Sequence, residues 1–427
     1  MIESNSFGFF DRDFEPTRSR WWTSVRAGVV ALATLIRLGW ALAVPVEPTS
    51  DCFAYELLAR NLAEGHGYGF APGQPSAYWP VGTSAVYAVL QGVMGPERWH
   101  VGAVGLNLAL GALTVWLSMT MTRDWFGPRA GLCAGLLMAF WPGQVEFTTL
   151  LASELPFNAC VLLALFAEGR DRWRPWVRVM FTGLALASAS YVRPLALPLP
   201  LILAWCRLVG PAAGSRTPRR VLLETAGVLA VMAVVIAPWT LRNARVLGRP
   251  VLISTNGGAN LWMGNHPGSD GGYTELPPSV EALPEVQRDD LLGAEAKRFI
   301  REHPGTFARG ALKKLVMTHD RENIGVVWNQ PALSRKYGDR VLMPLKLLST
   351  GYWWGALALG LVGAGVALRR LGILRASGLP PLALWGFFAA VHAVIVGGDR
   401  YHYPSVPFLA ALAGLAIVST WSRSRST

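Results

Sequence analysis

Apolar stretches close to the length of a membrane span recur from one end of the chain to the other. A helix needs roughly 20 apolar residues to cross the hydrocarbon core of a bilayer. About ten stretches approach that length: 27–45, 101–120, 130–147, 153–168, 179–192, 195–209, 221–240, 349–368, 382–397 and 403–420. Only 15% of the 427 residues are charged, against about 25% in a soluble domain. The sequence therefore predicts an all-α integral membrane protein with about ten transmembrane helices.

The arginines are distributed unequally between the two sides of these spans. Nineteen arginines fall on the side of the N-terminus, whereas the short loops on the other side hold four, namely Arg60, Arg98, Arg193 and Arg400. Basic residues accumulate on the cytoplasmic side of membrane proteins, so both termini are expected inside the cell. The net charge of +12 then reflects topology, and no nucleic-acid partner is expected.

This orientation divides the chain into four parts. We expect a cytoplasmic segment over 1–26, a transmembrane catalytic bundle over 27–240, an exterior segment over 241–348 and C-terminal transmembrane helices over 349–427. The bundle includes an exterior loop over 46–100.

The two exterior pieces carry patterns of secondary structure. Helices are predicted from Ser50 or Asp51 to Gly65 and over 84–93, 285–302 and 304–318, with the 84–93 helix on the membrane surface. Residues 250–264 suggest a short strand and a Gly/Asn-rich loop. The first exterior loop is therefore expected to carry amphipathic helices. The segment between the seventh and eighth spans is expected to be a small α/β or mostly helical domain.

Two acids stand at the exterior ends of predicted spans, where charge near lipid is costly. Asp51 precedes the first exterior helix, and Glu154 begins the fourth span. Two carboxylates that face one cavity can deprotonate an acceptor and orient it, or bind a metal ion. The alternative is helix capping, because each acid follows a serine at a helix N-terminus, where the helix dipole stabilises an anion. The sequence leaves both interpretations open.

Exterior arginines oppose the general charge bias, and guanidinium groups fit a phosphate well. Arg193 lies between two apolar runs, and Arg400 lies with His402 just before the last span. We predict that these three residues bind a phosphate. The alternative is an ordinary interfacial arginine or a local pair, such as Arg400 with Asp399. Further basic residues on this side are Arg242 and Arg245.

Other motifs offer no competing chemistry. The four cysteines have no metal-ligand spacing, and three of them lie in predicted spans, so no disulfide framework is expected. The chain lacks the P-loop, HExxH and GxSxG motifs.

Eight short motifs, in this order, resemble those of one family of membrane enzymes. They are Ser50-Asp51-Cys52-Phe53-Ala54-Tyr55, Ala63-Glu64-Gly65-His66-Gly67-Tyr68, Trp141-Pro142-Gly143-Gln144, Ala152-Ser153-Glu154-Leu155, Tyr191-Val192-Arg193-Pro194, Pro238-Trp239-Thr240-Leu241-Arg242-Asn243, Gly257-Gly258-Ala259-Asn260-Leu261-Trp262-Met263-Gly264-Asn265 and Arg400-Tyr401-His402-Tyr403-Pro404. Their order over 26–420 resembles the polyprenol-phosphate-dependent membrane glycosyltransferases of the C-type fold. Within these, the chain is similar to the branch of the protein O-mannosyltransferases and the bacterial aminoarabinose transferase.

The resemblance implies a reaction in the cell envelope, at a bacterial inner (plasma) membrane. A sugar on a polyprenyl phosphate would pass to a glycan, lipid or protein acceptor, with Asp51 as base and Glu154 assisting. Tyr55, Arg242 and Asn265 would contact substrate. No cofactor is required, and a divalent metal is possible.

This chain departs from the aminoarabinose branch at two places. That branch has an arginine soon after its acid and a lysine before a proline pair, where this chain has Ala54 and Tyr78-Trp79-Pro80. Other cations must then bind the phosphate. We predict a glycosyltransferase that acts by a single inverting displacement. The alternative is a transporter or flippase of lipid-linked saccharides without chemistry.

Overall fold

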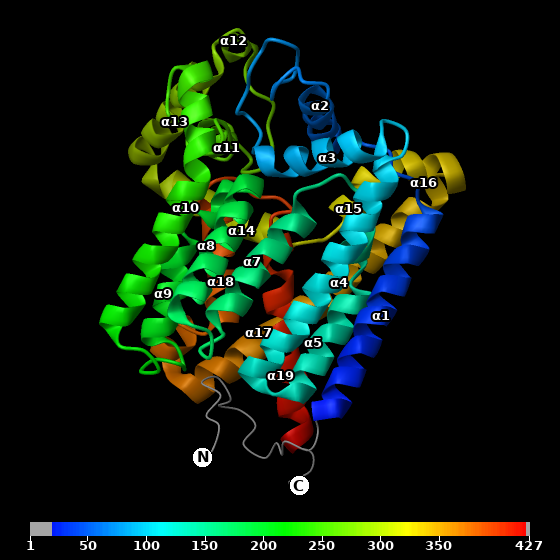
Figure 1. Cartoon of the computed structure of the whole chain (residues 1–427), viewed down its shortest axis with the longest axis vertical. Helices are drawn as coiled ribbons and strands as arrows, with labels where there is room; N and C mark the ends of the chain where they lie inside the picture. Colours follow the sequence, from blue (N-terminus) through cyan, green and yellow to red (C-terminus); the bar gives the residue numbers. More distant parts are fainter. Residues whose placement is uncertain (1–18, 424–427) are drawn as a thin grey trace.

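In the computed structural model, which describes residues 19–423, a tall bundle of helices carries smaller helices at one end (Figure 1). The first helix begins and the last helix ends at the opposite end. We call the end with the smaller helices the distal end. The described residues contain no β-strand, only an isolated bridge between Ala71 and Gln74. The all-α prediction is thus confirmed for this part of the chain. Residues 1–18 of the predicted cytoplasmic segment lie outside it.

Long and medium helices make up the bundle, and each predicted apolar stretch overlaps one of them. They are α1 (Ser19–Ala43), α4 (Trp99–Phe126), α5 (Pro128–Phe140), α7 (Glu154–Glu168), α8 (Pro175–Val192), α9 (Leu199–Val209), α10 (Pro218–Leu247), α17 (Leu342–Ser377), α18 (Pro380–Val394) and α19 (Val406–Arg423). Proline stands in the first turn of α5, α8, α10 and α18. Its missing N–H costs nothing there, and its fixed φ favours the start of a helix.

The number of ten crossings is not confirmed. By length and composition, five helices of the described chain could cross a membrane alone: α1, α4, α10, α17 and α19. A sixth span is possible if a bent pair of helices crosses together. The helices α5, α9 and α18 are apolar but shorter.

The predicted span 130–147 is interrupted. α5 ends at Phe140, because Pro142 keeps Trp141 extended (φ −67°, ψ 110°). The chain continues through α6 (Pro142–Glu146) and a 3₁₀ turn (Phe147–Thr149), and this piece makes an angle of 118° with α7. Glu154 therefore begins α7 directly after a sharp bend.

α19 is the central helix of the bundle. It packs against α4, α5, α17 and α18. In the apolar stretch that leads into and through α19, 78% of the residues are buried, whereas only 17–39% are buried in the corresponding stretches of the other four long spans. Gly363 of α17 allows the close approach, because a Cβ there would lie 2.6 Å from the carbonyl carbon of Leu412. Small residues allow such packing between membrane helices. The loop before α19, which carries Arg400, is therefore attached to a buried helix.

The smaller helices lie at or toward the distal end. They are α2 (Asp51–Ala63), α3 (Val81–Met94), α11 (Gly257–Met263), α12 (Pro278–Glu281), α13 (Glu285–Glu302), α14 (Pro304–His319), α15 (Ile324–Trp328) and α16 (Gln330–Tyr337). Further 3₁₀ turns span Pro194–Ala196, Asp339–Val341 and Tyr403–Ser405. The helices expected after Ser50 and over 84–93, 285–302 and 304–318 are all present.

Two expectations near residue 250 are wrong. The segment 250–264 forms no strand, and its Gly/Asn-rich part is α11, which packs on α13. The seventh span does not end at 240, because α10 continues through Pro238 to Leu247. Neighbouring groups can offset a proline in a membrane helix, and here the Tyr191 hydroxyl donates to the carbonyl of Val235 (2.8 Å).

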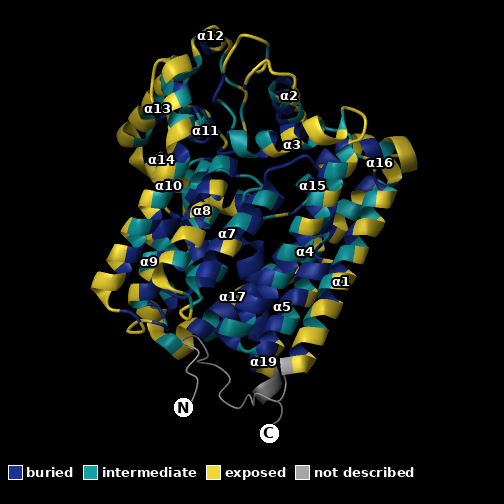
Figure 2. Ribbon diagram, viewed as in Figure 1, coloured by how far each residue is buried: buried dark blue, intermediate teal, exposed yellow. Residues whose placement is uncertain are grey.

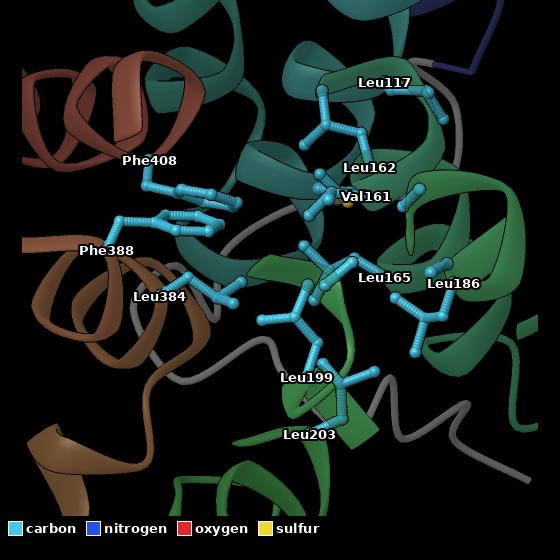
Figure 3. Close-up of a cluster of buried hydrophobic side chains, with 14 of the residues drawn as sticks. Leu117, Val161, Leu162, Leu165, Leu186, Leu199, Leu203, Leu384, Phe388 and Phe408 are labelled. Carbon is cyan, nitrogen blue, oxygen red and sulfur yellow. The ribbon is translucent and has the colours of Figure 1, made fainter. Parts of the chain in front are cut away.

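The core runs through the middle of the bundle, whereas the outer faces of α1 and α9 carry exposed residues (Figure 2). Figure 3 shows part of it, built from α4, α7, α8, α9, α18 and α19: Leu117, Val161, Leu162, Leu165, Leu186, Leu199, Leu203, Leu384, Phe388 and Phe408. A second cluster at the distal end includes Tyr55, Tyr87, Phe147, Trp328 and Tyr403. That cluster supports the start of α2 and α7, where the two candidate acids lie.

Candidate active site

Asp51 is the first residue of α2, and its side chain pairs with Arg400. Arg400 Nη1 donates to Asp51 Oδ2 across 349 positions of sequence. The guanidinium carbon also lies 5.2 Å and 5.1 Å from the ring centroids of Trp328 and Tyr401. The predicted alternative partner, Asp399, instead accepts a hydrogen bond from a backbone N–H just before α15 (3.2 Å). The tertiary pair therefore replaces the local one.

The residue before Asp51 has an unusual backbone conformation. Ser50 has φ 50° and ψ −125°, and no other non-glycine residue of the described chain has a positive φ. Such a conformation costs about 1–3 kcal/mol and persists only where the surroundings impose it. The strained turn fixes the direction in which α2 starts, and with it the position of Asp51.

Glu154 is the first residue of α7, and 1% of its side chain is exposed. Arg193, which follows α8, donates from Nη2 to Glu154 Oε1 and from Nε to Ser153 Oγ (2.9 Å). Neither Ser50 nor Ser153 makes a side-chain cap to the helix it precedes. The serines therefore do not cap these helices. Both carboxylates nevertheless lie in the first turn of their helix, where the helix dipole stabilises a negative charge.

The two ion pairs belong to one electrostatic cluster. Burial opposes the charge of Arg400, but Asp51 and Glu154 both act on it, and its pKa rises well above its ordinary value. Tyr55 of α2 senses charges of both pairs. Burial raises the pKa of its phenol against the influence of Arg193, and Asp51 and Glu154 again contribute. The structure therefore brings five of the predicted residues together.

His402 lies behind this cluster. Its Nδ1 is 2.7 Å from the carbonyl oxygen of Thr318, and its Nε2 is 3.2 Å from Glu322 Oε1. The ring stacks on Trp353, with the centroids 3.7 Å apart, and the residue is buried. Both ring nitrogens already have partners. The binding of phosphate by His402 stays a prediction, and it requires that at least one of these contacts breaks.

Arg242 and Asn265 hold backbone segments in place. Arg242 donates to the carbonyls of Ser76 (2.7 Å) and Tyr68 (2.8 Å) and lies over the ring of Trp239. It thereby ties the loop between α2 and α3 to α10. Asn265 is buried, and its amide nitrogen donates to three carbonyls, including those of residues 394 and 395. Their predicted contact with substrate is not tested by these contacts.

Two buried acids were not singled out from the sequence. Glu322 accepts from Trp141 Nε1 (2.7 Å), and Glu146 accepts from Ser349 Oγ (2.6 Å). Glu146 stands in an otherwise uncharged run, 141–153, which is a signal that could have identified it. Glu322 directly follows two charged residues, Asp320 and Arg321, and nothing in the sequence distinguishes it from them.

Lys314 was also missed as a special residue. It is buried in α14, and its Nζ donates to Asn265 Oδ1 (2.8 Å) and to the carbonyls of Gly264 (3.2 Å) and Val394 (2.8 Å). Burial lowers its pKa to about 8. The lysine of α14 thus joins the end of α11 to the end of α18.

An apolar cavity of about 630 Å³ lies between α3, α4, α7, α8 and α10. Its wall includes Pro156, two residues after Glu154, and Val192, which precedes Arg193. A mostly apolar cavity with polar groups beside it suits an amphiphilic ligand.

The residues of the cluster do not fit a divalent metal ion. Each acid faces an arginine, and the described residues contain no group of three His, Cys, Asp or Glu side chains arranged to bind one.

No family model matches the sequence, and no curated protein matches it. Solved structures do match. The oligosaccharyltransferase AglB of the archaeon Archaeoglobus fulgidus, in complex with an inhibitory peptide and a dolichol-phosphate, aligns with a TM-score of 0.58 at 13% identity, over 96% of this chain and 51% of that chain. Its apo form aligns at 0.57 and 14%, over the same shares. The chain has the C-type glycosyltransferase fold.

Five helices of the described chain are long and apolar enough to cross a membrane, which supports a multi-pass membrane protein. The chain spans about half the length of the archaeal enzyme that it matches. ArnT from Cupriavidus metallidurans, bound to undecaprenyl phosphate, aligns at a TM-score of 0.44 and 17% identity, over 95% of this chain and 79% of that chain.

Proposed function

We propose that this chain is a glycosyltransferase that moves a sugar from a polyprenyl-phosphate donor to an acceptor on the exterior face of the membrane. The position of the apolar cavity is the observation that carries the proposal, because its wall contains close neighbours of both Glu154 and Arg193. A polyprenyl tail in this cavity would bring its phosphate to Arg193 and then to Arg400. The archaeal structure of the same fold contains a dolichol-phosphate.

Asp51 is the base of the proposed reaction. It takes the proton of an acceptor hydroxyl, and the oxygen forms a bond to the anomeric carbon of the sugar. The bond from that carbon to the phosphate oxygen breaks, and polyprenyl phosphate leaves with the electron pair. Because attack and departure occur on opposite faces, the anomeric centre inverts.

The arginines stabilise the leaving group. The phosphate gains one negative charge while Asp51 gains a proton, so the net charge of the site does not change. Fixed donors aimed at charge that develops in the transition state contribute several kcal/mol. Arg193 is suited to this because Glu154 and Ser153 hold its guanidinium in place. Glu154 therefore acts by positioning Arg193.

A turnover assay separates this proposal from a flippase. The purified chain would be incubated with undecaprenyl-phosphate-linked hexoses and pentoses and a cell-envelope extract, and release of undecaprenyl phosphate would be measured. Asp51→Asn should lower turnover about 10²- to 10⁴-fold, as for other general bases, and keep donor binding. A chain that moves labelled lipid across liposomes equally well with Asp51→Asn, and never cleaves it, is a flippase.

The cavity is tested by filling it. Ser188 lines the cavity and is exposed, so Ser188→Phe should weaken donor binding while the fold survives. Leu184→Phe, one turn earlier on α8 and also exposed, is the matched control. Equal donor affinity in both variants would place the lipid elsewhere.

A further inference from the structure

Each candidate acid is bound to an arginine, but the two pairs differ in access. Glu154 and Arg193 have 1% and 16% of their side chains exposed, whereas Asp51 and Arg400 have 18% and 23%. Arg193 has a second anchor in Ser153 Oγ (2.9 Å). The pair of Asp51 and Arg400 is therefore the one that a ligand can reach and open.

This pair conflicts with the proposed reaction. Asp51 Oδ2 is engaged by Arg400 Nη1, so one of the two oxygens that could take the acceptor proton is already bound. The guanidinium that should bind the donor phosphate is likewise occupied by a carboxylate. While the contact persists, one oxygen of Asp51 and one N–H group of Arg400 are unavailable for the reaction.

A phosphate can take the place of the carboxylate. Both are anions that a guanidinium binds through charge-assisted hydrogen bonds, and arginine fits a phosphate with two parallel bonds. Arg400 would keep its position during the exchange, because it also lies 5.2 Å and 5.1 Å from the centroids of Trp328 and Tyr401.

We propose that Asp51 occupies the phosphate site of Arg400 until the lipid phosphate displaces it, so that donor binding itself releases the base. This inference rests on the proposed function and adds an order to it, with the donor binding before the acceptor is activated. In the donor-free protein, Arg400 then covers Asp51 Oδ2. The pair of Glu154 and Arg193 stays closed throughout.

A double-mutant cycle tests this exchange. Undecaprenyl phosphate is the probe, and its binding to the purified full chain in detergent is measured by native mass spectrometry. Asp51→Asn should bind the probe more tightly, on the order of tenfold, because a charged competitor is lost. Arg400→Ala should bind it tens-fold or more weakly. In the Arg400→Ala background, Asp51→Asn should then change affinity little.

The outcomes are distinguishable. If the wild type does not bind undecaprenyl phosphate, the proposed function fails. If it binds but Asp51→Asn has wild-type affinity, only the exchange is overturned. Equal tightening with and without Arg400 indicates plain charge repulsion and also overturns it. Glu56→Gln, which removes another acid of α2 that contacts Arg60 and His100, is the control and should have no effect. Asp51→Ser and Arg400→Lys serve if the first variants unfold.

Discussion

The carboxylate of Glu322 fills the space that a side chain at Gly143 would need. A Cβ on Gly143 would lie 2.7 Å from Glu322 Cδ, and the converse contact exists between Gly325 and Glu146, where a Cβ would lie 2.8 Å from Glu146 Cβ. Each of these two segments, which are far apart in sequence, therefore packs a glycine against a glutamate of the other. Glu322 also faces His402, two residues after Arg400, so this packing supports the loop of the site.

Alanine at either glycine should therefore destabilise the protein. Overpacking of this kind costs about 1–3 kcal/mol, so we expect Gly143→Ala and Gly325→Ala to unfold at lower temperature in detergent. Gly105→Ala on α4 meets nothing within 4 Å and should leave the melting temperature close to that of the wild type. Three indistinguishable melting curves would show that the buried acids can move aside freely.

Relieving the strain before Asp51 should separate stability from activity. Glycine adopts the conformation of Ser50 at little cost, so Ser50→Gly should keep or raise stability by up to about 1 kcal/mol. It should also lower turnover, because α2 is then less firmly directed. Chemical unfolding and the turnover assay on the same sample are the measurements. A loss of stability in Ser50→Gly would contradict the interpretation that the backbone of Ser50 is strained.

Arg242 should control the loop between α2 and α3. Arg242→Ala removes charge-assisted bonds to the carbonyls of Tyr68 and Ser76, and such bonds contribute about 1.5–3 kcal/mol. We expect faster limited proteolysis within 66–77 and reduced turnover. Arg245→Ala removes an exposed arginine of the same helix and should change neither. Identical cleavage in the two variants would refute the tether.

The buried amine of Lys314 should give a pH-dependent stability. Its pKa is about 8 in the folded chain and about 10.4 when exposed. Between these values the unfolded chain binds more protons, so the free energy of unfolding rises with pH. Relative to Lys314→Met, the wild type should gain roughly 2–3 kcal/mol from pH 8 to pH 10, at about 1.4 kcal/mol per pKa unit. Lys313→Met, at an exposed lysine, should show no such trend.

The orientation in the membrane is also testable. Tags at 75 and 290 lie in distal segments and should be accessible from outside intact cells. Tags at 172, 217 and 372 should be accessible only from the cytoplasm, as the arginine distribution predicts. Accessibility of site 217 from outside to an impermeant reagent would reverse the proposed side of the reaction.

The positions of most helices followed from the sequence. Apolar runs and proline placement are local properties, and they marked the bundle helices as well as the break before Pro304. The strand expected in 250–264 was wrong, because packing on α13 holds the Gly/Asn-rich segment as α11. The span expected over 130–147 was placed too far along the chain at its C-terminal end, because α5 ends at Phe140. Pro142, which ends this helix, was visible in the sequence.

The partners of the candidate residues were decided by the tertiary structure alone. Asp51 and Glu154 could be placed at helix starts from the sequence, but nothing in it assigned Arg400 to one and Arg193 to the other. It equally did not place His402 against Glu322 or Glu322 against Gly143. Helical periodicity fixes which residues share a face, whereas the approach of two helices depends on side chains from many segments at once. The ion pairs and the apolar cavity exist only where those segments meet.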